Sequence, residues 1–278
     1  MPLQRRVSNP PKRNPTTLLI PNHPKPSVTD TSTHDRQRGF ASVVFDCDST
    51  LARIEGIDEL AGDHADEIRA LTEAAMQGRV PLEEVYGRRL DIIRPTREML
   101  EVVGQAYVAG LVPDAREVVG ALRWLGKTVR ILSGGLRPPV EEVARALGLP
   151  LDAVSAVGIE CDASGEYAGF ERDCPLARSG GKVEVIREWD LPRPSMLVGD
   201  GATDLEAKPV VDLFAAYMGI AFRANVAAGA DVVLRDESLA PVLALAAGAE
   251  DRARLAGSRW ADVLARGDAL LAARPSTE

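Results

Sequence analysis

The sequence predicts an α/β protein with a doubly wound parallel sheet and a helical cap inserted after the first strand. Two observations support this prediction. Short apolar runs typical of buried strands alternate with amphipathic helical periods, and residues 57–109 contain helical periods alone. Strands that alternate with helices form parallel βαβ units. A helical insertion of this length after the first strand is typical of a cap over the sheet edge.

The expected strands are five apolar runs, each short enough for a buried strand: 41–45, 128–132, 195–198, 213–222 and 231–234. The expected helices are amphipathic periods, two of which begin at proline: 113–127, 139–147, 182–189 and 250–273. Between residues 154 and 170, the turn Asp162–Gly165 separates two β-prone arms and predicts a hairpin.

These elements divide the chain into a disordered leader at 1–38, a core at 39–56 and 110–247, the cap at 57–109, and a C-terminal helix in 248–278. The leader holds seven of the 19 prolines, and seven basic residues against two acidic ones. Dense prolines remove backbone donors and break helices, which favours disorder. A nucleic-acid-binding tail, a transit peptide and a misassigned translation start are weaker interpretations of this leader.

The composition excludes several classes of protein. Only three histidines are present, two of them in the leader, so neither a Ser-His-Asp hydrolase nor a multi-histidine metal site is expected. Three scattered cysteines are too few for a disulfide scaffold, which favours the cytoplasm. No apolar stretch approaches the roughly 18 residues of a membrane span, and the acidic body disfavours nucleic acid as a partner.

Two pairs of aspartates follow expected strands. Asp46 and Asp48 come directly after the most apolar strand, and Asp200 and Asp204 follow the strand at 195–198. The carboxyl ends of parallel strands meet at one edge of the sheet, where ligands bind. Clustered carboxylates repel, so they call for a cation or a shared proton, and oxygen donors with an open coordination shell suit Mg²⁺. For the first pair the alternative is a calcium-loop fragment or a solvated turn, and for the second it is an Asx-rich turn.

Three further segments supply groups that can hold a phosphate. Ser133-Gly134-Gly135 follows the second expected strand, and its hydroxyl and backbone N–H groups can face an anion. Lys182 opens a helix as a compact positive charge, and Thr203 lies between the two later aspartates. An ordinary loop, a surface lysine and a helix cap at Thr203 are the alternatives. Together with the aspartates, these residues suffice for phosphoryl transfer without histidine.

The sequence resembles the haloacid dehalogenase superfamily phosphatases in four motifs, which occur in the order of that family: Asp46-x-Asp48-x-Thr50, Ser133, Lys182 and Gly199-Asp200-x-x-x-Asp204. Within this superfamily it is similar to the phosphoserine phosphatases, from about residue 42 to residue 245 and including the cap. Further segments carry that likeness: Glu55–Leu60, Ala75-Met76, Gly165–Phe170 and Ser179–Lys182. The resemblance implies a haloacid-dehalogenase-like Rossmannoid core.

The resemblance also implies a mechanism at the sheet edge. Asp46 would attack phosphorus in line and form an aspartyl-phosphate. Asp48 would protonate the leaving alkoxide and then take a proton from the hydrolytic water. Mg²⁺ would be held by Asp46, the backbone carbonyl of Asp48, and Asp200. These roles amount to positioning and electrostatics, which phosphoryl transfer requires above all.

The same resemblance implies the residues that surround the phosphate. Ser133 and Lys182 would hold its equatorial oxygens, with the glycines of Ser133–Gly135 beside them. Asp204 would position Lys182 or a metal-bound water, and Thr203 would contact the phosphate. These residues complete the implied site on the core.

The cap is implied to select the substrate. Glu55 would pair with a substrate ammonium and Arg89 with its carboxylate, and Met76 would lie in the same pocket, 13 residues before Arg89 as in the family. A solvated loop acid and a cap-surface arginine are the alternative interpretations. Leu82 departs from the family pattern, which often has Phe there, and this change would loosen the apolar wall for a larger ester.

The implied function is Mg²⁺-dependent hydrolysis of L-phosphoserine to L-serine and phosphate, the last step of serine biosynthesis. Two alternatives stay open: a capped phosphatase or phosphotransferase for another small phosphate monoester, and a phospho-accepting signalling module. Asp48 and the cap argue against the signalling module, because a switch needs neither. The expected partner is a small phosphate monoester in the cytoplasm, with no nucleic acid and no membrane, and a homodimer is left open.

Overall fold

The structure is a computed structural model that describes residues 39–76, 80 and 82–273. The leader expected at 1–38 lies outside the described residues, and so do residues 77–79, 81 and 274–278. The described part of the chain from residue 39 onward forms its elements around a continuous hydrophobic core. In this part of the chain, no helix is long and apolar enough to cross a membrane.

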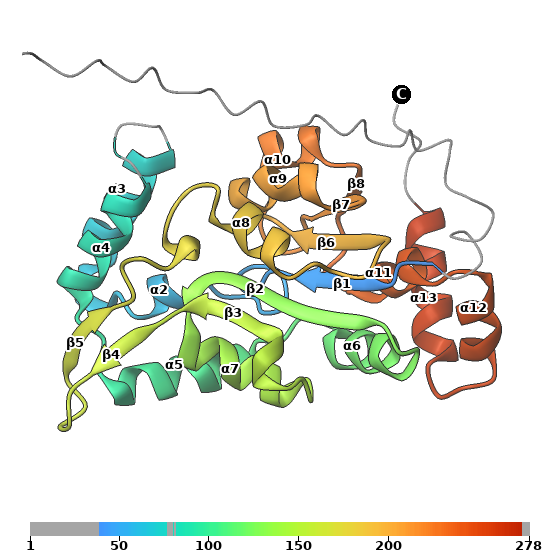
Figure 1. Cartoon of the computed structure of the whole chain (residues 1–278), viewed down its shortest axis with the longest axis horizontal. Coiled ribbons are helices and arrows are strands. Elements are labelled where there is room, and N and C mark those ends of the chain that lie inside the picture. The colour runs from blue at the N-terminus through green and yellow to red at the C-terminus, as the bar shows by residue number, and fades with distance from the viewer. Residues whose placement is uncertain (1–38, 77–79, 81, 274–278) are drawn as a thin grey trace, which may run out of the picture. The chain divides into compact units, whose positions relative to one another are not determined.

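Six parallel strands form the central sheet, in the order β3-β2-β1-β6-β7-β8 (Figure 1). Their bounds are β1 Ser42–Phe45, β2 Thr128–Leu136, β3 Val154–Val157, β6 Ser195–Gly199, β7 Leu213–Tyr217 and β8 Val232–Leu234. The strand order reverses between β1 and β6, because β2 and β3 lie on one side of β1 and the later strands on the other. All four residues of β1 are buried, which explains its unbroken apolar run. The predicted doubly wound parallel sheet is confirmed.

The second strand is longer than expected. β2 continues to Leu136 rather than ending at residue 132, and its pairing with β3 shifts between Leu132 and Leu136. A register shift of this kind interrupts the ladder and re-aims side chains. The segment Ser133–Gly135 therefore lies in extended backbone, rather than in a loop before the next helix.

The fourth expected strand is shorter than predicted. β7 ends at Tyr217, whereas the apolar pattern extends to residue 222. A side chain at Gly219 would lie 2.3 Å from the carbonyl oxygen of Asp236, so glycine lets the chain turn close against this backbone. Residues 218–223 consequently form a loop at the carboxyl edge of the sheet.

The segment expected as one hairpin contributes to two sheets. β3 joins the central sheet beside β2, and β4 (Ile159–Cys161) and β5 (Tyr167–Phe170) form an antiparallel hairpin. Three of the four β3 residues are buried, since this strand belongs to the core rather than to a free ribbon. The predicted turn is present, and the Oδ1 atom of Asp162 accepts from the backbone N–H of Ser164 at 2.8 Å.

Helices of the core flank this sheet (Figure 1). They are α6 Ala115–Trp124, α7 Arg137–Ala146, α8 Gly181–Glu188, α9 Ala202–Ala207, α10 Ala224–Gly229 and α11 Ala240–Ala246. Short 3₁₀ turns lie at η2 Leu151–Ala153, η3 Pro175–Ala177 and η4 Lys208–Val210. α6 buries the apolar face that its sequence predicts, since Val118, Val119 and Leu122 are fully buried.

Helical segments follow β1 as predicted: α2 Gly56–Glu59, η1 Gly62–His64, α3 Ala65–Met76, α4 Leu82–Ile93 and α5 Arg97–Ala109. Figure 1 shows α3 and α4 on the side toward which the β1 arrow points. α5 packs against α7 of the core, where a side chain at Gly104 would meet Glu142. The boundaries of a cap at 57–109 stay a prediction, and α5 shares its packing with the core.

The C-terminal segment forms two helices, α12 (Ala249–Ala256) and α13 (Ala261–Ala272). The prediction of one helix over 250–273 is therefore wrong. Gly257 caps α12, and the Ser258 hydroxyl donates to the Leu255 carbonyl at 2.8 Å and accepts from the Trp260 N–H at 3.1 Å. A hydroxyl that bonds to nearby backbone competes with helical hydrogen bonds, which explains the break.

Candidate active site

A cavity of about 230 Å³ lies at the carboxyl edge of the sheet, where the strand order reverses. The neighbouring strands β1 and β6 both end there. Nine residues predicted for the site line this cavity: Asp46, Asp48, Glu55, Arg89, Gly134, Gly135, Lys182, Asp200 and Thr203. The fold thus brings together side chains from five separate segments of the sequence.

Asp46 is held in place directly after β1. Its Oδ1 atom accepts from the backbone N–H of Cys47 at 2.8 Å and lies 3.0 Å from the Lys182 Nζ atom. Burial raises the pKa of the neighbouring Cys47 thiol, which therefore stays neutral. Between these adjacent residues, the carboxylate of Asp46 is the available nucleophile.

Lys182 and Asp204 form a buried ion pair behind Asp46. The Lys182 Nζ atom lies 2.6 Å from Oδ1 of Asp204, whose Oδ2 accepts from the Gly201 N–H at 3.0 Å. Burial lowers the pKa of Lys182, but the nearby carboxylates of Asp204 and Asp46 raise this pKa by more than burial lowers it. The ammonium group therefore keeps its charge. A side chain at Gly199 would lie within 2.3 Å of the Asp204 carboxyl group, so glycine admits this close approach.

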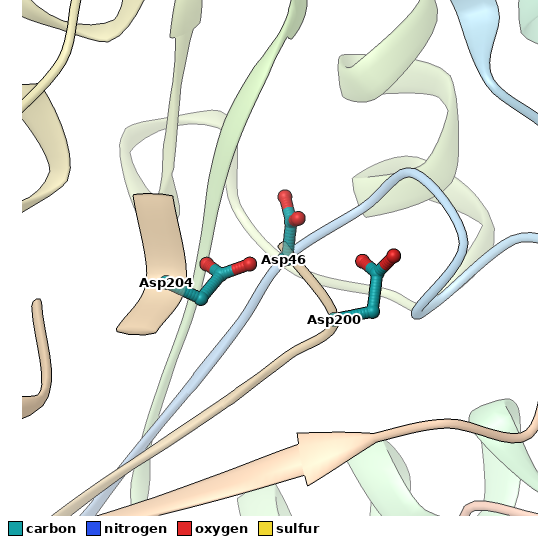
Figure 2. Close-up of side chains that lie close together, drawn as sticks. All are labelled: Asp46, Asp200 and Asp204. Carbon is teal, nitrogen blue, oxygen red and sulfur yellow. The ribbon is translucent and has the colours of Figure 1, made fainter. Parts of the chain in front are cut away.

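Three buried carboxylates converge at the sheet edge, those of Asp46, Asp200 and Asp204 (Figure 2). One oxygen from each lies within 4.8 Å of the others. Oδ1 of Asp204 pairs with Lys182 and its Oδ2 accepts from the Gly201 N–H, which fits its predicted role of positioning Lys182. Asp46 and Asp200 fit the predicted role of metal ligands, and the backbone carbonyl of Asp48 stays a predicted ligand.

The donor set suits a divalent cation. Thr50 Oγ1 donates to Oδ1 of Asp200 at 3.2 Å, and the guanidinium of Arg223 contacts Oδ2. Carboxylate and carbonyl oxygens are the ligands that Mg²⁺ prefers. Buried carboxylates at this spacing also repel, and a cation between them removes that repulsion. The residues present therefore fit a metal site.

Asp48 is fixed by three hydrogen bonds. Its Oδ1 atom accepts from the Tyr107 hydroxyl at 2.5 Å and from the Gly56 N–H at 2.7 Å, and its Oδ2 accepts from the Ser133 hydroxyl at 3.2 Å. Burial, followed by the nearby charges of Glu55 and Asp46, raises the pKa of Asp48 to about 7. A carboxyl group with this pKa exchanges a proton near neutral pH, as acid–base catalysis requires.

The Ser133–Gly135 segment lies beside Asp48. Ser133 is fully buried, and its Oγ accepts from the Gly135 N–H at 2.9 Å, so the side chain lies behind the surface of the cavity. A side chain at Gly135 would lie 2.9 Å from Oδ2 of Asp48, which only glycine avoids. Gly134 and Gly135 line the cavity, and the phosphate-binding role of Ser133 stays a prediction.

Glu55 and Arg89 lie in the same cavity as the aspartates. Oε1 of Glu55 accepts from the Ser49 hydroxyl at 2.7 Å and from Arg223 at 3.2 Å. The Arg89 guanidinium lies 5.6 Å from the centre of the Tyr86 ring. Met76 belongs to α3, but its side chain lies outside the described residues, so its predicted contact stays a prediction.

Several residues of the site are absent from the sequence prediction, among them Tyr86, Tyr107 and Arg223. Arg223 ends the loop after β7 and directly follows the apolar run 213–222, so the search for polar residues at strand ends could have found it. Tyr86 lines the cavity one helical turn after Leu82, and its hydroxyl donates to the Gly134 carbonyl at 2.9 Å. Tyr107 lies on the buried face of α5 and carried no distinguishing signal.

Comparison with known proteins identifies the family. The family model of haloacid dehalogenase-like hydrolases matches residues 43–207. The chloroplastic phosphoserine phosphatase of Arabidopsis thaliana is 38% identical over 213 residues, which cover 74% of this chain and 72% of that protein. The phosphoserine phosphatase of Bos taurus is 38% identical over 200 residues, which cover 70% of this chain and 89% of that protein.

A solved structure agrees with this assignment. The probable phosphoserine phosphatase of Vibrio cholerae, in its unliganded form, superposes with a TM-score of 0.60 at 26% identity, covering 77% of this chain and 66% of that one. The chain belongs to the haloacid dehalogenase-like hydrolase family. The predicted family and the predicted class of enzyme, a hydrolase, are thereby confirmed, and the signalling module is set aside.

Proposed function

We propose that this chain hydrolyses L-phosphoserine to L-serine and phosphate. One observation carries the proposal: a single cavity holds Asp46 and Lys182 together with Glu55 and Arg89. The first two residues suit an attack on a phosphate ester, and the other two match the ammonium and carboxylate of an amino acid. The relatives named as phosphoserine phosphatases support the same substrate.

The proposed reaction has two halves. In the first, one carboxylate oxygen of Asp46 attacks phosphorus, the ester bond breaks, and Asp48 gives its proton to the departing serine oxygen. In the second, Asp48 takes a proton from water, the water oxygen bonds to phosphorus, and the acyl–phosphate bond breaks to restore Asp46. Ser133, Lys182 and Thr203 hold the phosphate oxygens, with Gly134 and Gly135 beside them. The serine pathway is the proposed setting of this reaction.

We propose Mg²⁺ as the metal. Asp46, Asp200 and the backbone carbonyl of Asp48 would hold it, and Asp204 would keep Lys182 beside it. When bound, the ion offsets the repulsion between an anionic nucleophile and an anionic ester. The oxygen-only donor set supports Mg²⁺ over metals that prefer nitrogen or sulfur ligands.

Substrate selection is proposed to lie on the cap side. Arg89 is the partner for the substrate carboxylate, because its planar guanidinium allows two parallel hydrogen bonds. Glu55 is the partner for the ammonium, with Oε1 already oriented by Ser49 and Arg223. Met76 remains a proposed contact.

A second candidate is a phosphatase or phosphotransferase for another small monoester. The observation that favours it is Leu82, at a position where the family often has Phe. Tyr86 weakens this candidate, because its buried ring supplies an aromatic wall one turn further along α4.

A phosphate-release assay tests the proposal. Phosphoserine, phosphothreonine and a sugar phosphate are compared by kcat/KM, each with Mg²⁺ and after EDTA treatment. We expect phosphoserine to be preferred, EDTA to silence turnover, and added Mg²⁺ to restore it. Preference for the sugar phosphate would replace serine as the substrate, and full activity without divalent metal would contradict the metal site.

The setting of the protein is also proposed. We keep a cytoplasmic location as the working hypothesis, although the Arabidopsis thaliana relative is named as chloroplastic. A small phosphate monoester is the partner, and nucleic acid and membrane are not expected. Size measurement in solution tests whether the chain forms a homodimer.

A further inference from the structure

Tyr107 lies directly behind the proposed acid–base residue. The tyrosine belongs to α5, is 1% exposed, and donates its hydroxyl hydrogen to Oδ1 of Asp48 at 2.5 Å. The backbone N–H of Gly56 donates to the same oxygen at 2.7 Å. Asp48 lines the cavity and Tyr107 does not, so the tyrosine reaches the site through Asp48.

The surrounding backbone is shaped to admit this hydroxyl. A side chain at Gly56 would lie 2.2 Å from the Tyr107 hydroxyl oxygen, and one at Gly135 would lie 3.4 Å from it and 2.9 Å from Oδ2 of Asp48. Neither glycine has a positive φ, so space rather than backbone conformation requires glycine at both positions. The contact between the Tyr107 hydroxyl and the Asp48 carboxyl group is therefore closely packed on two sides, at Gly56 and at Gly135.

Two donors on one oxygen orient the whole carboxyl group. The last torsion of an aspartate is broad, so without such donors the group can rotate. Because Oδ1 accepts from both Tyr107 and Gly56, a proton on this carboxyl group belongs on Oδ2. That oxygen faces Ser133, beside the two glycines that line the cavity.

We propose that Tyr107 is a positioning residue, which holds Oδ1 of Asp48 against the wall and so keeps Oδ2 toward the oxygen of the leaving alcohol. The inference rests on the proposed function, in which Asp48 protonates that alcohol. Proton transfer requires donor and acceptor to be held at hydrogen-bond distance in a fixed orientation. Tyr107 therefore affects the step in which the ester bond breaks, and chiefly for esters whose alcohol needs a proton.

The test compares two leaving groups in a Tyr107→Phe variant. Phosphoserine releases an alkoxide that needs a proton, whereas p-nitrophenyl phosphate releases a stable phenolate that does not. We expect kcat/KM for phosphoserine to fall about tenfold or more, with less than about a twofold change for p-nitrophenyl phosphate. A residue that only supports the fold would change both esters alike.

Tyr217→Phe is the matched control. Tyr217 is fully buried in β7, its hydroxyl donates to the Glu237 carbonyl, and it does not line the cavity. This variant removes the same hydroxyl from a buried tyrosine, and we expect it to leave the ratio of the two esters unchanged. Thermal unfolding of both variants reports their fold separately.

A second variant displaces the hydroxyl without removing it. Gly56→Ala places a methyl group where the Tyr107 hydroxyl lies, and we expect the same selective loss on phosphoserine. Should Tyr107→Phe not fold, this variant decides the question. Equal losses on both esters, or no loss on either, would overturn the inference. If the wild type fails to hydrolyse phosphoserine, the proposed substrate is wrong, and the comparison is made with the alkyl phosphate that it hydrolyses fastest.

Discussion

The sheet edge and the cap side of the cavity hold their charged groups differently. At the sheet edge, the side chains of Asp46, Lys182 and Asp204 are at most 10% exposed, and the Lys182 Nζ atom lies 2.6–3.0 Å from the two carboxylates. On the cap side, the Glu55 side chain is 44% exposed and Arg89 is half-buried. One half of the cavity is a fixed, water-poor cluster, and the other is open to solvent.

This difference matches two tasks. Charge that develops during phosphoryl transfer is stabilised best by groups that are already oriented and shielded from water. Recognition of a small amino acid needs complementary charges, but those charges must also admit and release the molecule. Substitutions at the sheet edge should therefore abolish turnover with any ester, whereas substitutions on the cap side should change which ester is preferred.

The largest effect is expected for Asp46→Asn. The amide is a poor nucleophile, so kcat should fall by about 10⁴-fold or more for every phosphate ester tried. Steady-state assays with phosphoserine and p-nitrophenyl phosphate measure this loss, and thermal unfolding checks that the fold persists. Normal turnover by a folded variant would remove Asp46 from the reaction.

Arg89→Ala tests the cap side of the cavity, where a substitution should affect one ester more than another. Hydrogen bonds to a charged group contribute about 1.5–3 kcal/mol, so kcat/KM for phosphoserine should fall about 10–100-fold. p-Nitrophenyl phosphate lacks the carboxylate and should be affected far less. Arg88→Ala is the control, because Arg88 is the exposed neighbour on the same helix. Equal losses in the two variants would argue against a carboxylate partner at Arg89.

Two substitutions of Tyr86 separate the effect of its ring, which forms part of the pocket wall, from the effect of its hydrogen bond to Gly134. Tyr86→Ala removes the buried ring and should shift the preference between phosphoserine and phosphothreonine by about tenfold toward the larger ester. Tyr86→Phe keeps the ring but loses the bond to the Gly134 carbonyl, and should leave that preference unchanged. A preference that follows the hydroxyl instead of the ring would contradict the proposed wall.

The smallest expected effect is a pH-dependent change in the thermal stability of an Asp48→Asn variant. The pKa of Asp48 is about 7 in the folded protein, above its ordinary value of 3.8. Between these values the folded protein binds more protons than the unfolded chain, so its stability falls as the pH rises from about 4 to about 7. Asp48→Asn avoids this cost, and we expect the metal-free variant to unfold about 2–4 °C above wild type at pH 8.

The difference in melting temperature between Asp48→Asn and wild type should become smaller toward pH 5, where wild-type Asp48 is largely protonated. Calorimetry in EDTA at both pH values measures it. A difference in melting temperature that is the same at both pH values would show that the charge of the Asp48 carboxylate does not cause it.

The sheet-edge residues could be predicted because a general rule places them. Polar residues that end parallel strands meet at one edge, so the sequence alone predicts that Asp46 and Asp200 lie together. Ser133 illustrates the limit of this rule. It was expected to follow a strand that ends at residue 132, but β2 continues to Leu136 with a shift in its pairing to β3, so Ser133 lies within the strand.

Tyr107 could not be predicted in the same way. Tyr107 falls on the buried stripe of α5 with Leu100 and Val103, and this pattern is also that of an ordinary core residue. Only the path of α5 beside α2 turns its hydroxyl toward Asp48. Arg223 differs from Tyr107, because it directly follows the apolar run 213–222 and the same strand-end rule could have included it, although the run extends past the true end of β7.

Chemical trapping of the phosphorylated enzyme tests the central claim most directly. The enzyme is mixed with phosphoserine and Mg²⁺, quenched during turnover and treated with borohydride, which reduces an aspartyl-phosphate to homoserine. Peptide mass spectrometry should then find homoserine at position 46, and at none of the other aspartates of the cavity. Phosphate release at the normal rate with unmodified Asp46, or with the modification at another residue, would contradict the account.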